Sequence, residues 1–346
     1  MVEERALVKT GTAAAIAVCI MVSACGDSAA QAPPPVSADE LAAARQAVVA
    51  AGGHVSTGRA AAGVNASSPT KCNAPGTQFV EARTGTVKDN EGREWRVPAA
   101  VHSGDSGTDL FNDCTNNGLN TNYAAQLDTI VIDPDGVEVT AFIHGDNYFE
   151  LYVNGTFVCR DPIAFTPFNS TACRFRVKYP ITYALRAVDW EEHLGVGMDY
   201  GRYNVGDGGI VAHFSDGTLT DESWKAETYS IAPLDNTTCL KFSALGGRDS
   251  SACPVKPACA TSARAATCQA VHFPEPAGWA APEFNDGDWP AASVYTRAQF
   301  GPKEAYTSLE SEFGAARFIW SRNIKIDNLV LLRKTVATPQ LRSEQP

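Results

Sequence analysis

The chain has 346 residues, of which 44% are hydrophobic and 9% are aromatic. This composition excludes a disordered chain, because enough apolar surface is available to build a sizeable core. Acidic residues outnumber basic ones by 39 to 28, and the formal net charge is -11. We expect no nucleic-acid partner, because phosphates are bound by clustered Lys and Arg.

The N-terminus has the pattern of an export signal. Arg5 and Lys9 precede an apolar stretch that is too short to span a bilayer. The sequence VSAC at residues 22–25 resembles a bacterial lipobox. The resemblance implies that residues 1–24 are a signal peptide and that a lipidated Cys25 anchors the chain to a membrane. An ordinary signal peptide cleaved near Ala24 is the alternative. We expect an exported protein of the cell envelope, facing the periplasm or the surface.

Ten cysteines are present, and two of them, Cys19 and Cys25, belong to the export signal. The even number that remains predicts up to four disulfides in an exported chain. The spacing favours two local pairs, Cys159 with Cys173 and Cys253 with Cys259. Zinc is not expected, because no C-x-x-C spacing is present and no histidine stands beside a cysteine. The eight candidates are Cys72, Cys114, Cys159, Cys173, Cys239, Cys253, Cys259 and Cys268.

Residues 25–70 are rich in Ala, Pro and Gly and predict a tether. Within it, Ser37 and Glu40 form a capping-box pattern before a run of strong helix formers that ends at Gly52-Gly53. A short helix is therefore expected in the tether. The folded body is predicted to begin near Lys71 and to extend to residue 338, followed by a flexible tail at 339–346.

The body alternates apolar and polar residues with period two, which predicts half-buried strands. Asn154-Gly155 predicts a tight hairpin between two of them, because both residues tolerate positive φ. Regularly spaced short strands indicate an all-β sandwich or jelly roll. Residues 246–282 lack periodicity and contain three cysteines, so they predict a disulfide-pinned loop insert. Strands are expected at 137–144, 148–153, 173–178, 183–190, 210–214, 317–320 and 324–333.

Four segments resemble, in order, the galactose-binding-like jelly rolls that accompany many glycoside hydrolases and rhamnosidases. They are GDNYFELYVNG at 145–155, DGTLTDESWK at 216–225, FNDGDWPAA at 284–292 and FIWS at 318–321. The resemblance covers roughly residues 123–335. It implies a jelly roll with Trp224 and Trp289 packed in its interior. Enzymes with this module carry a separate catalytic barrel, for which this chain has no room, so a non-catalytic carbohydrate-binding protein is expected.

Two segments contain candidate ligand-binding side chains. Asp189, Glu191, Glu192 and His193 form a dense cluster whose carboxylates can accept sugar hydroxyls, bind Ca²⁺ or serve as the acid and base of a glycoside hydrolase. A solvated strand end is the plain alternative. Tyr200, Tyr203, Asn204 and Asp207 lie in a Gly-rich loop. Tyrosines can stack on a sugar ring while amide and carboxylate groups bind its hydroxyls, although an ordinary turn has the same composition.

His144 and Asp146 are predicted in a loop before a hairpin strand, a favourable place for ligand binding. Three functions follow from these patterns. The first is an envelope-anchored, non-catalytic carbohydrate-binding or adhesion lipoprotein that contacts a glycan or the envelope surface. The second is a glycan-active hydrolase centred on residues 189–193. The third is a structural envelope protein that binds another protein.

Overall fold

A computed structural model of the protein describes residues 36–59, 85–98, 102–112, 119–162, 169–189, 195–198, 203–244 and 247–340. The described residues from Ser37 onward belong to one folded unit. The predicted signal peptide, the lipidation site at Cys25, the cysteines Cys72 and Cys114 and the tail beyond residue 340 lie outside the described residues.

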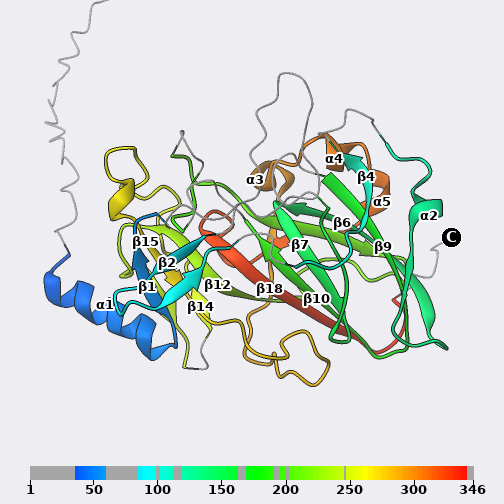
Figure 1. The fold of residues 1–346 in the computed structure, drawn as a ribbon, viewed down its shortest axis with the longest axis horizontal. Helices are drawn as coiled ribbons and strands as arrows, with labels where there is room; N and C mark the ends of the chain where they lie inside the picture. Colours follow the sequence, from blue (N-terminus) through cyan, green and yellow to red (C-terminus); the bar gives the residue numbers. More distant parts are fainter. Residues whose placement is uncertain are drawn as a thin grey trace, which may run out of the picture. The chain divides into compact units, whose positions relative to one another are not determined.

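Two packed sheets of mostly antiparallel strands form the fold, which is an all-β sandwich as the sequence predicts. In the first sheet, the central strand β18 (Asp327–Val336) lies between β12 (Lys225–Leu234) and β10 (Ile181–Val188) (Figure 1). The strand order of the first sheet is β1 (His54–Thr57), β15 (Gln269–His272), β12 (Lys225–Leu234), β18 (Asp327–Val336), β10 (Ile181–Val188), β7 (Tyr148–Val153) and β8 (Thr156–Arg160).

The second sheet is antiparallel except at one edge, where β5 (Thr129–Val131) pairs with β9 in parallel. Its strand order is β16 (Ser293–Tyr295), β17 (Phe318–Trp320), β11 (Gly209–Phe214), β6 (Val137–Asp146), β9 (Asn169–Val177) and β4 (Thr108–Asn112). Two small hairpins stand apart from these sheets, β2 (Thr86–Lys88) with β3 (Glu94–Arg96) and β13 (Lys241–Phe242) with β14 (Arg248–Asp249).

Helices are short in the described residues. The longest is α1 (Ala38–Ala50), which begins with the predicted capping box of Ser37 and Glu40. It ends before Gly52, whose φ of +81° favours glycine. The others are α2 (Tyr123–Gln126), α3 (Arg297–Phe300), α4 (Glu304–Thr307), α5 (Glu310–Phe313) and the 3₁₀ turn η1 (Ala265–Thr267).

The main core lies between the two sheets. Trp224 is fully buried there and packs near Tyr183 and Phe214, with ring centroids 6.5 and 6.2 Å away. Trp289 is buried elsewhere, beside Tyr229. Both tryptophans are thus packing residues, as predicted. A second apolar cluster, which includes Val48 of α1, Tyr229 and Leu331, covers the other face of the first sheet.

Burial on both faces explains the composition of the central strands of the first sheet. All eight residues of β10 are buried, and so are nine of the ten residues of β12. A strand covered on two sides loses the alternation of apolar and polar residues that marks a half-exposed strand. The segment between residues 239 and 292, together with α1 and the β2–β3 hairpin, supplies this second cover.

The predicted strands at 137–144, 148–153, 173–178 and 210–214 correspond to β6, β7, β9 and β11. The predicted hairpin is present, with φ of 48° at Asn154 and 80° at Gly155. Two other segments differ from prediction. β1 lies within the predicted tether and pairs with β15, so the sheet begins before Lys71. β15 itself lies in the predicted loop insert, which therefore contributes a strand to the first sheet.

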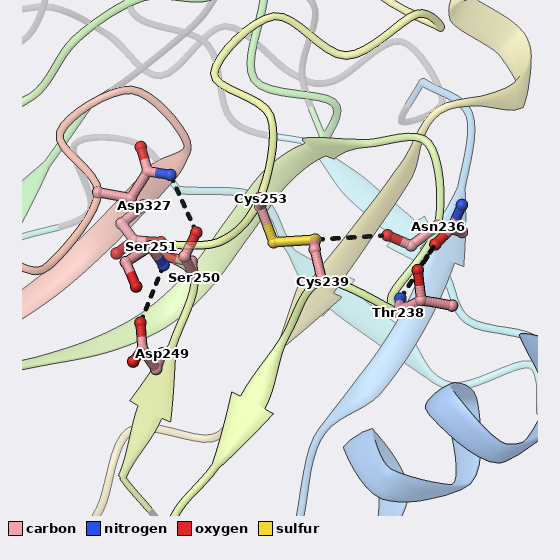
Figure 2. Close-up of a disulfide and its surroundings, with 9 residues drawn as sticks. Asn236, Thr238, Cys239, Asp249, Ser250, Ser251, Cys253 and Asp327 are labelled. Carbon is pink, nitrogen blue, oxygen red and sulfur yellow. Dashed lines mark hydrogen bonds between the residues drawn. A yellow bond between two sulfur atoms is a disulfide. The ribbon is translucent and has the colours of Figure 1, made fainter. Parts of the chain in front are cut away.

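The described residues form three disulfides. The predicted Cys159–Cys173 pair is confirmed, whereas the predicted Cys253–Cys259 pair is wrong. Cys253 is joined to Cys239 instead, because the β13–β14 hairpin folds the two cysteines to a Cα separation of 4.8 Å (Figure 2). Cys259 pairs with Cys268. Two bonds thus fasten the segment that covers the first sheet.

Candidate functional site

His144 and Asp146 lie on a strand, not in the loop predicted for them. β6 continues to Asp146 because its last residues pair with both neighbours: His144 is opposite Ser170 of β9, and Asp146 is opposite Gly209 of β11. The His144 side chain is fully buried, and its Nδ1 lies 3.1 Å from Ser170 Oγ. This histidine therefore has a structural position between the sheet and the helices that cover it.

The structure brings together three aspartates of the predicted site. Asp146 is buried, and its pKa lies well above the usual range, first through burial and then through the nearby charges of Asp207 and Asp189. Asp189 is buried at the end of β10, and Asp207 pairs with Lys325 at 3.0 Å. A residue from each of the two predicted segments thus lies near Asp146.

Few of the other predicted ligand-binding residues lie within the described part of the chain. Glu191, Glu192, His193 and Tyr200 lie outside the described residues. Tyr203 is half-buried and Asn204 is exposed. Within the described part of the chain, no group of three or more His, Cys, Asp or Glu side chains is arranged as a metal site. The predicted calcium ligands Glu191 and Glu192 lie outside that part of the chain.

A pocket of about 430 Å³ opens over the first sheet. Its floor includes Glu150 of β7, Arg186 of β10, Tyr229 of β12 and Leu329 of β18, all of them buried. We call it the Arg186 pocket. Its remaining walls are Trp95, Arg96, Val97, Pro98, His102, Tyr152, Ser230, His272, Phe273, Pro274 and Glu275.

The floor contains a buried ion pair. Glu150 and Arg186 are directly opposite on adjacent strands, and Arg186 Nη1 lies 3.7 Å from Glu150 Oε1. Their side chains are only 2% and 9% exposed. The hydroxyls of Tyr148 and Tyr152 donate to the two Glu150 oxygens at 3.1 and 2.8 Å. Burial and the Glu150 charge raise the pKa of both tyrosines, so both phenols remain donors.

Arg186 forms one side-chain hydrogen bond with the described residues. Its Nε donates to Glu275 Oε1 at 3.0 Å, while its Nη1 has no hydrogen-bond partner among the residues that the structure describes. Burial lowers the pKa of Arg186, but Glu275 and Glu150 outweigh this effect, and the pKa lies above its usual value. Arg186 is therefore a permanent cation in the floor. A guanidinium has five N–H donors, fixed in one plane.

Trp95 and His272 form one wall of the pocket. Their rings stack with centroids 5.6 Å apart and planes at 16°. The Trp95 indole N–H donates to Asp89 Oδ2 at 3.0 Å, which fixes the ring. Burial lowers the pKa of His272 to about 4, and its Nε2 lies 2.7 Å from Ser56 Oγ. This wall is thus uncharged and flat at neutral pH.

None of the residues in the floor of the Arg186 pocket stands in a motif that the sequence marks as a site. Alternation along 148–153 places Glu150 on the polar side of its strand, yet that side is covered. One signal was present: each charge stands among apolar residues in a strand long enough to be central to a sheet. Trp95, Glu150 and Glu275 are far apart in the chain, so their meeting depends on the fold.

No protein-family model, curated protein or solved structure matches the chain. Within the described residues, no helix has the length and apolar character needed to cross a membrane. The residues of the Arg186 pocket are therefore the basis for a functional proposal.

Proposed function

We propose that the protein is a non-catalytic carbohydrate-binding protein and that the Arg186 pocket is its binding site. The observation that carries this proposal is a nearly buried guanidinium in the floor of an aromatic-walled pocket, bonded through Nε to the partly exposed Glu275. A buried ion pair is often no more stabilising than apolar residues of the same size. Its presence beneath an open pocket favours a role in recognition.

The chemistry of the walls suits a sugar. Pyranose rings have apolar faces that pack on aromatic side chains, and their equatorial hydroxyls bind planar polar groups. Trp95 and Tyr152 supply aromatic surface, and Arg186 supplies donors in a fixed plane. The volume of about 430 Å³ falls within the range of small-molecule sites, roughly 300 to 1,000 Å³.

The state of the pocket carboxylates favours binding without turnover. Glycoside hydrolysis needs one carboxyl group as acid and another as base or nucleophile. Glu150 uses both oxygens for tyrosine hydroxyls, and Glu275 bonds to Arg186. Both carboxylates are thus engaged by donors of the protein itself. The alternative hydrolase centre at residues 189–193 begins with Asp189, which is buried, and its other members lie outside the described residues.

The proposal keeps the envelope location that the N-terminal sequence indicates. A lipidated Cys25 would hold the sandwich at a membrane surface, where a glycan site has a use. The resemblance of four segments to galactose-binding-like modules supports the same class of function. A structural envelope protein that binds another protein is the competing outcome of the test below.

The test is retention of the full-length protein on a panel of immobilised envelope and environmental polysaccharides. We expect retention by the native protein and a loss of at least about tenfold in affinity for Arg186→Lys, which keeps the charge but lacks the planar fork. Arg297→Lys is the matched control, since Arg297 forms an exposed ion pair on α3.

Three results contradict the proposal. Absence of retention on every polysaccharide excludes carbohydrate binding and favours a protein partner. Equal affinity of Arg186→Lys and the native protein places the site elsewhere. Release of reducing sugar from a retained glycan shows that the protein is an enzyme.

A further inference from the structure

We infer that the Arg186 pocket selects sugars that carry a carboxylate, and that Glu275 occupies the position which the sugar carboxylate would take. This inference rests on the proposed function and names its ligand class.

Hydrogen-bond donors outnumber available acceptors in the floor of the Arg186 pocket. Glu150 is the only carboxylate in the buried part of the described lining, and two tyrosine hydroxyls already occupy its oxygens. Arg186 donates through Nε at the pocket side, whereas its Nη1 is buried beside Glu150 and has no hydrogen-bond partner among the described residues. A sugar hydroxyl both donates and accepts, whereas a carboxylate only accepts, through two oxygens that match the guanidinium fork. The floor is therefore better matched to a carboxylate.

Glu275 shows that a carboxylate fits this place. Its Oε1 accepts from Arg186 Nε at 3.0 Å, although the two residues are 89 positions apart in the chain. The Glu275 side chain is 30% exposed, whereas that of Arg186 is 9% exposed. The hydrogen-bond partner of the buried cation is thus a side chain at the mouth of the pocket that can turn into water.

The backbone around Glu275 favours such an exchange. Pro274 and Pro276 flank the residue and fix their own φ angles, and each restricts the residue before it. The exchange therefore needs only rotation of the Glu275 side chain, with no rearrangement of the chain. A ligand carboxylate gains the bond that Glu275 gives up, so the protein carboxylate acts as an internal competitor.

The charges of the pocket agree with this exchange. When Glu275 turns outward, Arg186 and the rim residue Arg96 face one remaining acidic group in the described lining, Glu150. The protein as a whole has a formal net charge of -11, which repels polyanions in general. Retention of an acidic glycan therefore requires a local cationic site and does not arise from non-specific adsorption.

The experiment is isothermal titration of the full-length protein with trigalacturonic acid and with galactotriose, its neutral counterpart. We expect the acid to bind at least about tenfold more tightly than the neutral sugar. Glu275→Gln removes the competing charge and should tighten binding of the acid by about tenfold, with a change below about twofold for the neutral sugar. Glu283→Gln, an exposed position on the same segment, is the control and should change neither affinity.

The outcomes separate the two proposals. Equal affinity for both sugars overturns the selectivity for a carboxylate and leaves the carbohydrate-binding proposal standing. Weaker binding of the acid by Glu275→Gln overturns the competitor role, because it makes Glu275 part of the ligand contact. If the native protein binds neither sugar and no polysaccharide on the panel, both proposals fall together.

Discussion

Replacement of Arg186 by Met tests the buried ion pair directly. The substitution keeps an unbranched apolar stem but leaves Glu150, with a side chain only 2% exposed, without its cation. Removal of one partner from a buried pair typically destabilises a protein by about 3–5 kcal/mol. We expect a loss of this size, which is a large fraction of the about 5–15 kcal/mol that holds a typical domain together.

Urea denaturation followed by tryptophan fluorescence measures this loss. The double variant Arg186→Met with Glu150→Gln should recover about 2 kcal/mol or more, because the buried carboxylate charge is gone and the amide oxygen still accepts from a tyrosine. Arg297→Met serves as the control. Arg297 and Glu310 are both about half exposed, and such pairs contribute less than about 1 kcal/mol.

Two results would refute this reasoning. If Arg186→Met loses less than about 1 kcal/mol, the pair is not needed to neutralise a buried charge. If the double variant is no more stable than the single one, the loss comes from packing of the arginine stem, and Glu150 has no part in it.

Three further predictions concern stability. Burial lowers the pKa of His272 from its usual 6.5 to about 4. The free energy of unfolding should therefore decrease by about 3 kcal/mol as the pH falls from 6.5 to about 4, because the unfolded chain binds a proton first. Between about pH 7 and about pH 4.5, the free energy of unfolding of His272→Gln, measured by urea titration, should decrease less than that of the native protein. An equal decrease in both proteins contradicts this prediction. The double variant Cys239→Ser with Cys253→Ser removes a disulfide between cysteines 14 positions apart, and its free energy of unfolding, measured by calorimetry, should be lower by about 3 kcal/mol. An unchanged Tm contradicts this prediction. Trp224→Ala should cost about 3–5 kcal/mol in urea; a loss below about 2 kcal/mol would place Trp224 outside the core.

Local features of the fold were predictable from the sequence. The alternation at 137–144 and 148–153 predicted β6 and β7, and Asn154-Gly155 predicted the turn between β7 and β8. The capping box of Ser37 and Glu40 predicted the start of α1. In each case the physical cause acts within a few residues, through side-chain period, turn geometry or a capped N–H group, so the sequence determined these elements without reference to the rest of the chain.

Only the tertiary structure decided the edge strands and the pocket. β1 and β15 have four residues each and little alternation, and they pair with one another across more than two hundred residues of chain. Cys253 binds Cys239 because a hairpin joins them, not because of spacing along the chain. Glu150, Arg186 and Glu275 resemble ordinary surface charges until strand pairing buries two of them and brings the third above them. The free energy of such contacts comes from partners that are distant in sequence, so a local sequence pattern cannot predict the contacts.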